Sequence, residues 1–198
     1  MKPLWLFLLL LAGCGPSVPK IAHLAPDAAI LAFGDSLTYG TGAAPGASYP
    51  DRLQTLLGRA VIRAGIPGET TAESLARLPE VLDESGPRLL ILCIGGNDFL
   101  RGMGEQQAAD NIRAMIRLAR EKGAEVVLIG VPKFGLMVTP PKFYQKIAGE
   151  FHIPYEGEVM HKILLRRELK ADEVHPNAEG YRVFAEAVAA LLKKSGAV

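Results

Sequence analysis

The sequence predicts an α/β fold of three layers, in which a mostly parallel sheet of about five strands lies between two layers of helices. Two observations carry this prediction. Short apolar runs that are typical of buried strands alternate along the chain with amphipathic stretches that are typical of helices. The clearest run, at residues 88–94, is continuously apolar from Leu89 onward. Such a run indicates a central strand whose two faces are both covered.

The predicted elements follow one another in a regular order. Apolar runs predict strands at residues 29–33, 60–63, 88–94 and 125–130. Apolar residues at helical spacing predict helices at residues 52–57, 71–82, 106–122, 144–150, 158–168 and 178–194. Gly123 ends the third of these helices, because glycine readily adopts the left-handed conformation that terminates a helix. Strands joined through helices in this way form a parallel sheet with right-handed connections.

Length and composition agree with one main folded domain. The chain has 198 residues, of which 49% are hydrophobic and 22% are charged, as in ordinary globular proteins. The net charge is +1, and no long run of either sign occurs. A nucleic-acid partner is therefore not expected, because such a partner requires clustered basic residues.

The N-terminal residues predict export and a lipid anchor. Lys2 precedes an apolar stretch at residues 4–11, which matches a secretory signal and is shorter than the roughly 20 residues that span a bilayer. The Leu-Ala-Gly-Cys sequence that ends at Cys14 resembles the lipobox of bacterial lipoproteins. The resemblance implies a signal peptide at residues 1–13, a lipidated Cys14, a tether at residues 14–27 and a domain at residues 28–198.

Gly15 after the cysteine further implies the periplasmic face of the outer membrane, in the cell envelope of a Gram-negative bacterium. An ordinary cleaved signal with a chance cysteine is the alternative. Cys93, inside an apolar run, is predicted to be a buried thiol that does not pair with Cys14.

Serine, histidine and aspartate occur in segments that suit nucleophilic catalysis. Ser36 directly follows the first predicted strand, where a sharp turn presents its hydroxyl outward. Asp172 and His175 are three residues apart ahead of the last helix, so the carboxylate can accept from Nδ1–H and leave Nε2 as a base. Each motif taken alone is more typical of a turn or a surface helix cap.

Two further segments offer hydrogen-bond donors. Gly68 follows the second predicted strand and has a backbone amide that no side chain shields. Asn97 follows two glycines after the third strand, where its side-chain amide can reach a cleft. A loop that enters a helix and a helix-capping asparagine are the alternatives for these residues. All four segments together provide a nucleophile, a base, an orienting carboxylate and oxyanion donors, as acyl transfer requires.

The four segments resemble, in order and spacing, the blocks of the GDSL (SGNH) hydrolase family. The blocks are Gly-Asp-Ser-Leu at 34–37, Pro-Gly-Glu-Thr at 67–70, Gly-Gly-Asn-Asp at 95–98 and Asp-x-x-His at 172–175. The similarity covers residues 28–192 and is greatest to the bacterial periplasmic thioesterase, arylesterase and lysophospholipase branch. There the second block continues into a Ser-Leu-Ala-Arg-Leu helix, here residues 74–78. The resemblance implies the flavodoxin-like fold of that family.

The resemblance also assigns roles to the matching residues. It makes Ser36 the nucleophile, His175 the general base and Asp172 the residue that orients the base. It forms the oxyanion hole from the backbone amides of Ser36 and Gly68 and the side chain of Asn97.

Two neighbouring carboxylates are implied to be structural. Asp35 is expected to support the turn that carries the nucleophile, and Asp98 is expected to support the loop of Asn97. No metal or cofactor is implied, and the expected protein is a monomer.

The implied substrate is a small acyl ester or thioester, including aryl and short-to-medium acyl esters and lysophospholipids. Residues 131–144 contain three prolines and depart from the family pattern. Because this segment helps to shape the acyl pocket in the family, it leaves substrate preference open. A carbohydrate O-acetyl esterase that acts on cell-envelope polysaccharide is one alternative. A lipoprotein that binds ligands without catalysis is another.

Overall fold

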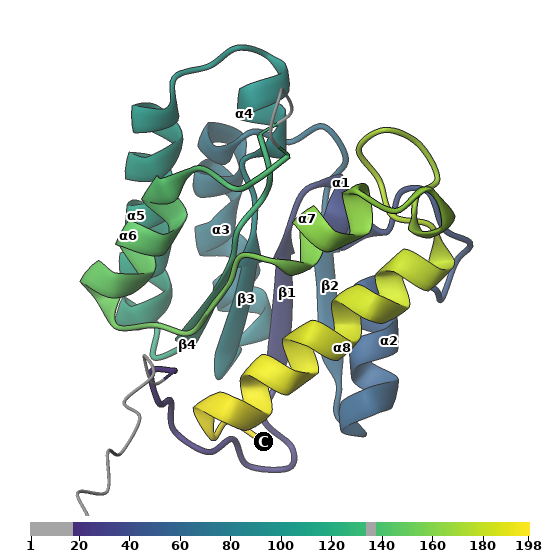
Figure 1. Ribbon diagram of the computed structural model, residues 1–198. Coiled ribbons are helices and arrows are strands. Elements are labelled where there is room, and N and C mark those ends of the chain that lie inside the picture. Colours follow the sequence, from purple (N-terminus) through teal and green to yellow (C-terminus); the bar gives the residue numbers. More distant parts are fainter. Residues whose placement is uncertain (1–17, 134–137) are drawn as a thin grey trace, which may run out of the picture.

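A computed structural model describes residues 18–133 and 138–198 and shows the predicted layered architecture (Figure 1). The five strands of the sheet are all parallel and lie in the order β2-β1-β3-β4-β5. They are β1 (Ile30–Gly34), β2 (Val61–Gly65), β3 (Leu89–Cys93), β4 (Glu125–Ile129) and β5 (Tyr155–Glu156). The predicted fold class is confirmed, although the two-residue β5 lies where no strand was expected.

Helices cover both faces of the sheet. On one face α2 packs against α8, and on the other α3 packs against α5, with α6 beside α5 (Figure 1). The helices are α1 (Ser36–Tyr39), α2 (Tyr49–Leu57), α3 (Thr71–Ser85), α4 (Gly96–Leu100), α5 (Glu105–Glu121), α6 (Lys142–Phe151), α7 (Val159–Leu164) and α8 (Ala178–Ser195). The two shortest of them, α1 and α4, were not predicted.

The burial of the strands explains how clearly each could be recognised. Every residue of β1 and β3 is buried, because these strands lie at the centre of the sheet. The edge strand β2 exposes Ile62 and Arg63 and buries Val61. Cys93, the last residue of β3, is the predicted buried free thiol, and its burial raises the pKa of the thiol.

The helix predicted at residues 158–168 is wrong in its second half. α7 ends at Leu164, and only a short 3-10 turn follows at Arg167–Leu169. The helix ends because the backbone of Arg166 is extended, with a φ of −113° and a ψ of 112°, and Asn177 then holds the segment that follows. The Asn177 amide donates to the Leu169 carbonyl at 2.9 Å, and its side chain donates to the Glu168 carbonyl at 2.9 Å.

The folded domain starts earlier than the predicted position near Ala28. The backbone amides of Ile21 and Leu24 donate to the carbonyls of Ser195 and Ala197, at 3.1 and 2.9 Å. Leu24 is buried in the core beside the end of α8. The part of the expected tether near these residues is therefore packed against the domain. Among the described residues, no helix is long and apolar enough to cross a membrane.

The order of the strands creates a crevice at one edge of the sheet. From β1 the chain moves outward to β2, and then it crosses over to β3 on the other side of β1. The connections that leave β1 and β3 therefore diverge at the carboxyl ends of these two strands. In open α/β sheets, ligands bind at such a point.

Candidate active site

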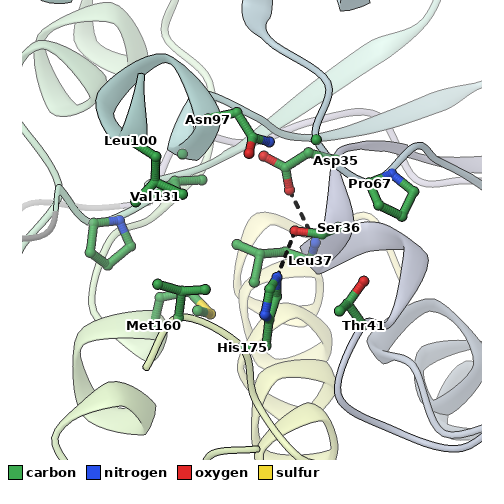
Figure 2. Close-up of a pocket in the computed structure, with 14 residues that line it drawn as sticks. Asp35, Ser36, Leu37, Thr41, Pro67, Asn97, Leu100, Val131, Met160 and His175 are labelled. Carbon is green, nitrogen blue, oxygen red and sulfur yellow. Dashed lines mark hydrogen bonds between the residues drawn. The ribbon is translucent and has the colours of Figure 1, made fainter. Parts of the chain in front are cut away.

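A cavity of about 170 Å³ lies at the carboxyl ends of β1 and β3, where the crevice is expected (Figure 2). Ser36, Gly68, Asn97 and His175 all line it. These residues come from four loops, and the first and last of them are 139 positions apart. The fold thus brings together the four segments that the sequence analysis singled out.

Ser36 is placed by a tight junction between β1 and α1. Gly34 ends β1, and a Cβ atom there would lie 1.9 Å from the Cys93 carbonyl oxygen, so only glycine fits. Asp35 then caps α1, because its Oδ1 accepts from the Leu37 amide at 3.0 Å. Ser36 is the first residue of α1, and its side chain faces the cavity (Figure 2).

The Ser36 hydroxyl meets the imidazole of His175. The Ser36 Oγ–His175 Nε2 distance is 2.9 Å, and the His175 Nδ1–Asp172 Oδ2 distance is 2.8 Å. Since an ionised carboxylate only accepts, Nδ1 carries the proton and donates to Asp172. Nε2 is then the acceptor for the Ser36 hydroxyl. The three side chains are bonded in series, in the direction that proton transfer from serine requires.

The carboxylate of Asp172 is held by its own loop. Its Oδ1 accepts from the backbone amides of Val174 and His175, both at 2.8 Å. Partial burial raises the pKa of Asp172, but the bonds from the His175 ring and these two amides outweigh it. The pKa of Asp172 therefore lies below its ordinary value, so the carboxylate remains charged at neutral pH.

Gly68 lies at the left-handed position of a tight turn. The Glu69 amide donates to the Ile66 carbonyl at 3.2 Å, which closes a turn over Ile66, Pro67, Gly68 and Glu69. Gly68 has a φ of 83°. A turn with proline second and a positive φ third is of type II, and glycine is the residue that tolerates this third position.

Three hydrogen-bond donors lie together at the cavity. Within residues 18–133 and 138–198, the amides of Ser36 and Gly68 donate to no other group. The side chain of Asn97 donates from Nδ2 to the Glu69 carbonyl at 2.9 Å, which leaves its second N–H free. Free N–H groups that line a cavity beside a nucleophile can bind a developing oxyanion.

The Asn97 loop is held by buried contacts. Asp98 is 1% exposed and accepts from the Thr71 amide at 2.9 Å and from the Thr71 hydroxyl at 2.6 Å. Gly95 has a φ of 124°, and a Cβ atom there would lie 2.3 Å from the Tyr144 hydroxyl. That hydroxyl donates to the Ile94 carbonyl at 2.8 Å. These contacts join the start of α4 to α3 and α6.

Asp35 is a buried carboxyl without a cationic partner among the described residues. Burial is the main cause that raises the pKa of Asp35 to about 7, and the neighbouring carboxylates of Glu69 and Asp98 add to it. The bond from the Leu37 amide opposes this rise. Glu69 differs, because Arg77 binds it through two nitrogens at 2.8 and 2.6 Å.

The remaining wall of the cavity is mostly apolar and was mostly not predicted. Besides Asp35, Thr41 and Gly96, the described residues that form it are Leu37, Pro67, Leu100, Val131, Pro132, Met160 and Val174. Of the segment expected to shape an acyl pocket, Val131 and Pro132 line the cavity, while residues 134–137 lie outside the described residues. Met160 comes from α7, where its spacing is that of an ordinary core residue, so no sequence signal marked it.

In the part of the chain that the structure describes, His, Cys, Asp and Glu side chains form no group of three that could hold a metal ion.

A serine hydroxyl, an imidazole and a carboxylate in series, beside free amide donors, define a serine hydrolase. The pattern of the GDSL-like Lipase/Acylhydrolase family matches residues 32–183, and the chain belongs to this family. The predicted resemblance is thereby confirmed.

Similar proteins are named as esterases and thioesterases. Esterase TesA of Pseudomonas aeruginosa is 37% identical over 135 residues, which cover 64% of this chain and 67% of that protein. Thioesterase 1/protease 1/lysophospholipase L1 of Escherichia coli K12 is 30% identical over 174 residues, 83% of each chain. A crystal structure of TesA superposes with a TM-score of 0.73 at 29% identity and covers 83% of this chain and 98% of its own. The protein is an ester-bond hydrolase of the esterase and thioesterase type.

Proposed function

We propose that Ser36, His175 and Asp172 are the catalytic triad of this esterase. The observation that carries the proposal is the pair of distances of 2.9 Å from Ser36 Oγ to His175 Nε2 and 2.8 Å from His175 Nδ1 to Asp172 Oδ2. Both lie within hydrogen-bond range, which is the geometric requirement for a nucleophile and its base.

The reaction that these groups support is a two-step acyl transfer. Ser36 Oγ attacks the carbonyl carbon of the ester or thioester while Nε2 of His175 takes the hydroxyl proton. The tetrahedral intermediate collapses, and the alcohol or thiol leaves with that proton. Water then attacks the acyl-enzyme with His175 again as base, which releases the acid and restores Ser36. Asp172 keeps Nδ1 protonated throughout and stabilises the imidazolium.

The oxyanion hole of this proposal consists of the amides of Ser36 and Gly68 and the side chain of Asn97. The two amides have no other partner among the described residues, and Asn97 keeps one free N–H. Asp35 and Asp98 are assigned supporting roles, since Asp35 caps the helix of the nucleophile and Asp98 fixes the start of α3.

The nucleophile is tested by labelling with a fluorophosphonate probe, which reacts with an activated serine. Wild-type protein and a Ser85→Ala control should be labelled, and Ser36→Ala should be neither labelled nor active on p-nitrophenyl butyrate. Ser85 is a suitable control because it is half-buried, as Ser36 is, and lies at the end of α3. Full labelling of Ser36→Ala would reject the proposal, and absence of labelling in wild type would favour a binding module.

The substrate that best suits the cavity has an apolar acyl group. The wall that Leu100, Val131, Pro132 and Met160 form offers few polar partners for a sugar, which disfavours the carbohydrate O-acetyl esterase alternative. We expect kcat/KM to rise from acetyl to longer acyl esters and thioesters. Met160→Trp should shift this preference toward short chains. Acetylated sugars as the best substrates would contradict the proposal.

The lipid anchor also remains a proposal, since residues 1–13 and Cys14 lie outside the described residues. We infer that Cys14 is acylated and that the protein is a monomer attached to the envelope, at the periplasmic face of the outer membrane. Multiple acyl chains are required for stable attachment. Labelling of cells with radioactive palmitate should mark the wild type and not Cys14→Ser, and light scattering should give the mass of one chain. Labelling of both forms would reject this assignment.

A further inference from the structure

One polar contact beside the cavity has no part in the mechanism described above. Arg101, directly after α4, donates from Nη2 to the backbone carbonyl of Gly68 at 2.6 Å. The two residues are 33 positions apart, so helix formation does not require this bond. The guanidinium also lies 3.8 Å from the carboxylate of Glu73 in the first turn of α3. Arg101 thus connects the loop that carries Asn97 to the loop that carries Gly68.

We propose that Arg101 is a positioning residue of the oxyanion hole, which holds the Gly68 carbonyl so that the Gly68 amide faces the cavity. The inference rests on the proposed function of Ser36 and its oxyanion hole. Arg101 lines a neighbouring hollow, which shares Pro67 and Gly68 with the catalytic cavity, and it does not line that cavity itself. It therefore acts through Gly68 and does not contact the substrate.

The physical reason lies in the freedom of a glycine. Two peptide planes meet at the Cα of Gly68, and one carries its N–H while the other carries its C=O. A residue without a Cβ restricts neither plane, so Gly68 can visit many conformations. On the first side, Pro67 limits the backbone through its ring. On the second side, the guanidinium fixes the carbonyl. The amide plane is thereby held between two restraints.

The backbone of α4 strengthens the coupling. The Arg101 amide donates to the carbonyl of Asn97 at 3.0 Å, and the Asn97 side chain donates to the Glu69 carbonyl at 2.9 Å. Asn97 and Arg101 therefore donate to the carbonyls of two adjacent residues, Glu69 and Gly68. Asn97 itself belongs to the proposed oxyanion hole, whereas Arg101 supports another donor of that hole, the Gly68 amide.

The experiment compares Arg101→Met with Arg120→Met. Arg120 is a matched control, because it is also exposed and donates from Nη2 to a backbone carbonyl, that of Phe151, at 2.6 Å. Outright loss of an oxyanion donor costs about 10²–10³ in kcat, so misorientation of one donor should cost about tenfold. We expect Arg101→Met to lower kcat about tenfold with little change in KM, and Arg120→Met to leave both unchanged.

Further readouts separate positioning from a general loss of structure. The rate of phosphonylation by a fluorophosphonate should fall by the same factor as kcat, since that reaction also builds negative charge in the hole. Arg101→Lys should recover part of the rate through one N–H donor. Both methionine variants should melt within about 3 °C of wild type, as expected for the loss of one exposed hydrogen bond.

The outcomes distinguish this inference from the function on which it rests. If Arg101→Met retains the wild-type kcat and phosphonylation rate while Ser36→Ala is inactive, only the role of Arg101 is rejected. If the change appears in KM alone, Arg101 contacts the substrate instead and the inference is equally rejected. If Ser36→Ala remains active, the proposed function itself fails.

Discussion

The nucleophile side of the active site is held by buried contacts between distant segments, whereas the base side is a surface loop held largely by its own residues. On the nucleophile side, Asp98 is 1% exposed and binds Thr71, which is 27 positions away. On the base side, the Asp172 side chain is 52% exposed and accepts amides only two and three positions away. We therefore expect substitutions on the nucleophile side to alter stability as well as catalysis, and substitutions on the base side to alter catalysis alone.

Replacement of the base gives the largest expected effect and tests the second half of the comparison. His175→Ala should lower kcat about 10⁵-fold, because loss of one triad member removes most of the concerted action of the set. The free energy of unfolding should change by only about 1 kcal/mol, because the hydrogen bonds of the ring go to Asp172 of its own loop and to the Ser36 hydroxyl. Ester hydrolysis and chemical denaturation measure the two quantities. A large loss of stability would break the comparison.

Asp35→Asn should stabilise the protein in a manner that depends on pH. Burial raises the pKa of Asp35 from 3.8 to about 7 on folding. The free energy of unfolding is therefore unaffected by this group below pH 3.8, and it falls as the pH rises from 3.8 to about 7. A shift of this size corresponds to at most about 4 kcal/mol. The gain from Asp35→Asn should therefore be larger at pH 8 than at pH 5 in thermal denaturation. An equal gain at both values would contradict the raised pKa.

Asn97→Ala should lower kcat by about 10²–10³, which corresponds to about 3 kcal/mol of transition-state stabilisation. The reason is that, in the proposed oxyanion hole, the Asn97 side chain donates one N–H to the oxyanion in addition to its bond to the Glu69 carbonyl. Steady-state kinetics on p-nitrophenyl butyrate provide the measurement. A change confined to KM would show that Asn97 binds the ground state and would remove it from the oxyanion hole.

Asp98→Asn should lower the free energy of unfolding by about 2 kcal/mol, which is the smallest of these effects. In the variant, the side-chain NH₂ group of residue 98 would face either the amide or the hydroxyl of Thr71, and both of these are donors. One buried donor would then lose its acceptor. Asp27→Asn is the matched control, because Asp27 is exposed. Urea denaturation of both variants checks the difference. Equal stability of the two variants would show that the buried contacts of Asp98 do not stabilise the nucleophile side.

The site was more predictable than the contacts that support it. Ser36, His175 and Asp172, the residues of the proposed triad, could be predicted to meet because each lies in a short contiguous motif whose position relative to strands and helices is visible in the sequence. Met160 and Arg101 could not, because nothing in their local spacing differs from that of a core methionine and a solvated arginine. Their place in the site became visible only when their distances to other loops were known.

The same distinction explains the errors in the fold. The helix at residues 158–168 follows a valid apolar pattern, yet Arg166 is extended and contacts with Asn177 hold the segment after it. The start near Ala28 followed from the prolines before it, yet Leu24 is buried beside the end of α8. In both cases a residue from another segment outweighed the local preference.

The sequence by itself determined the alternation of strands and helices, the turns that carry Ser36 and Gly68, and the choice of the proposed reacting groups. These properties depend on neighbours within a few positions, where periodicity and backbone preference act. Only the tertiary structure decided the apolar cavity wall, the raised pKa of Asp35 and the contact between Arg101 and Gly68. Each of these depends on distance and burial, which arise when segments far apart in the chain pack together.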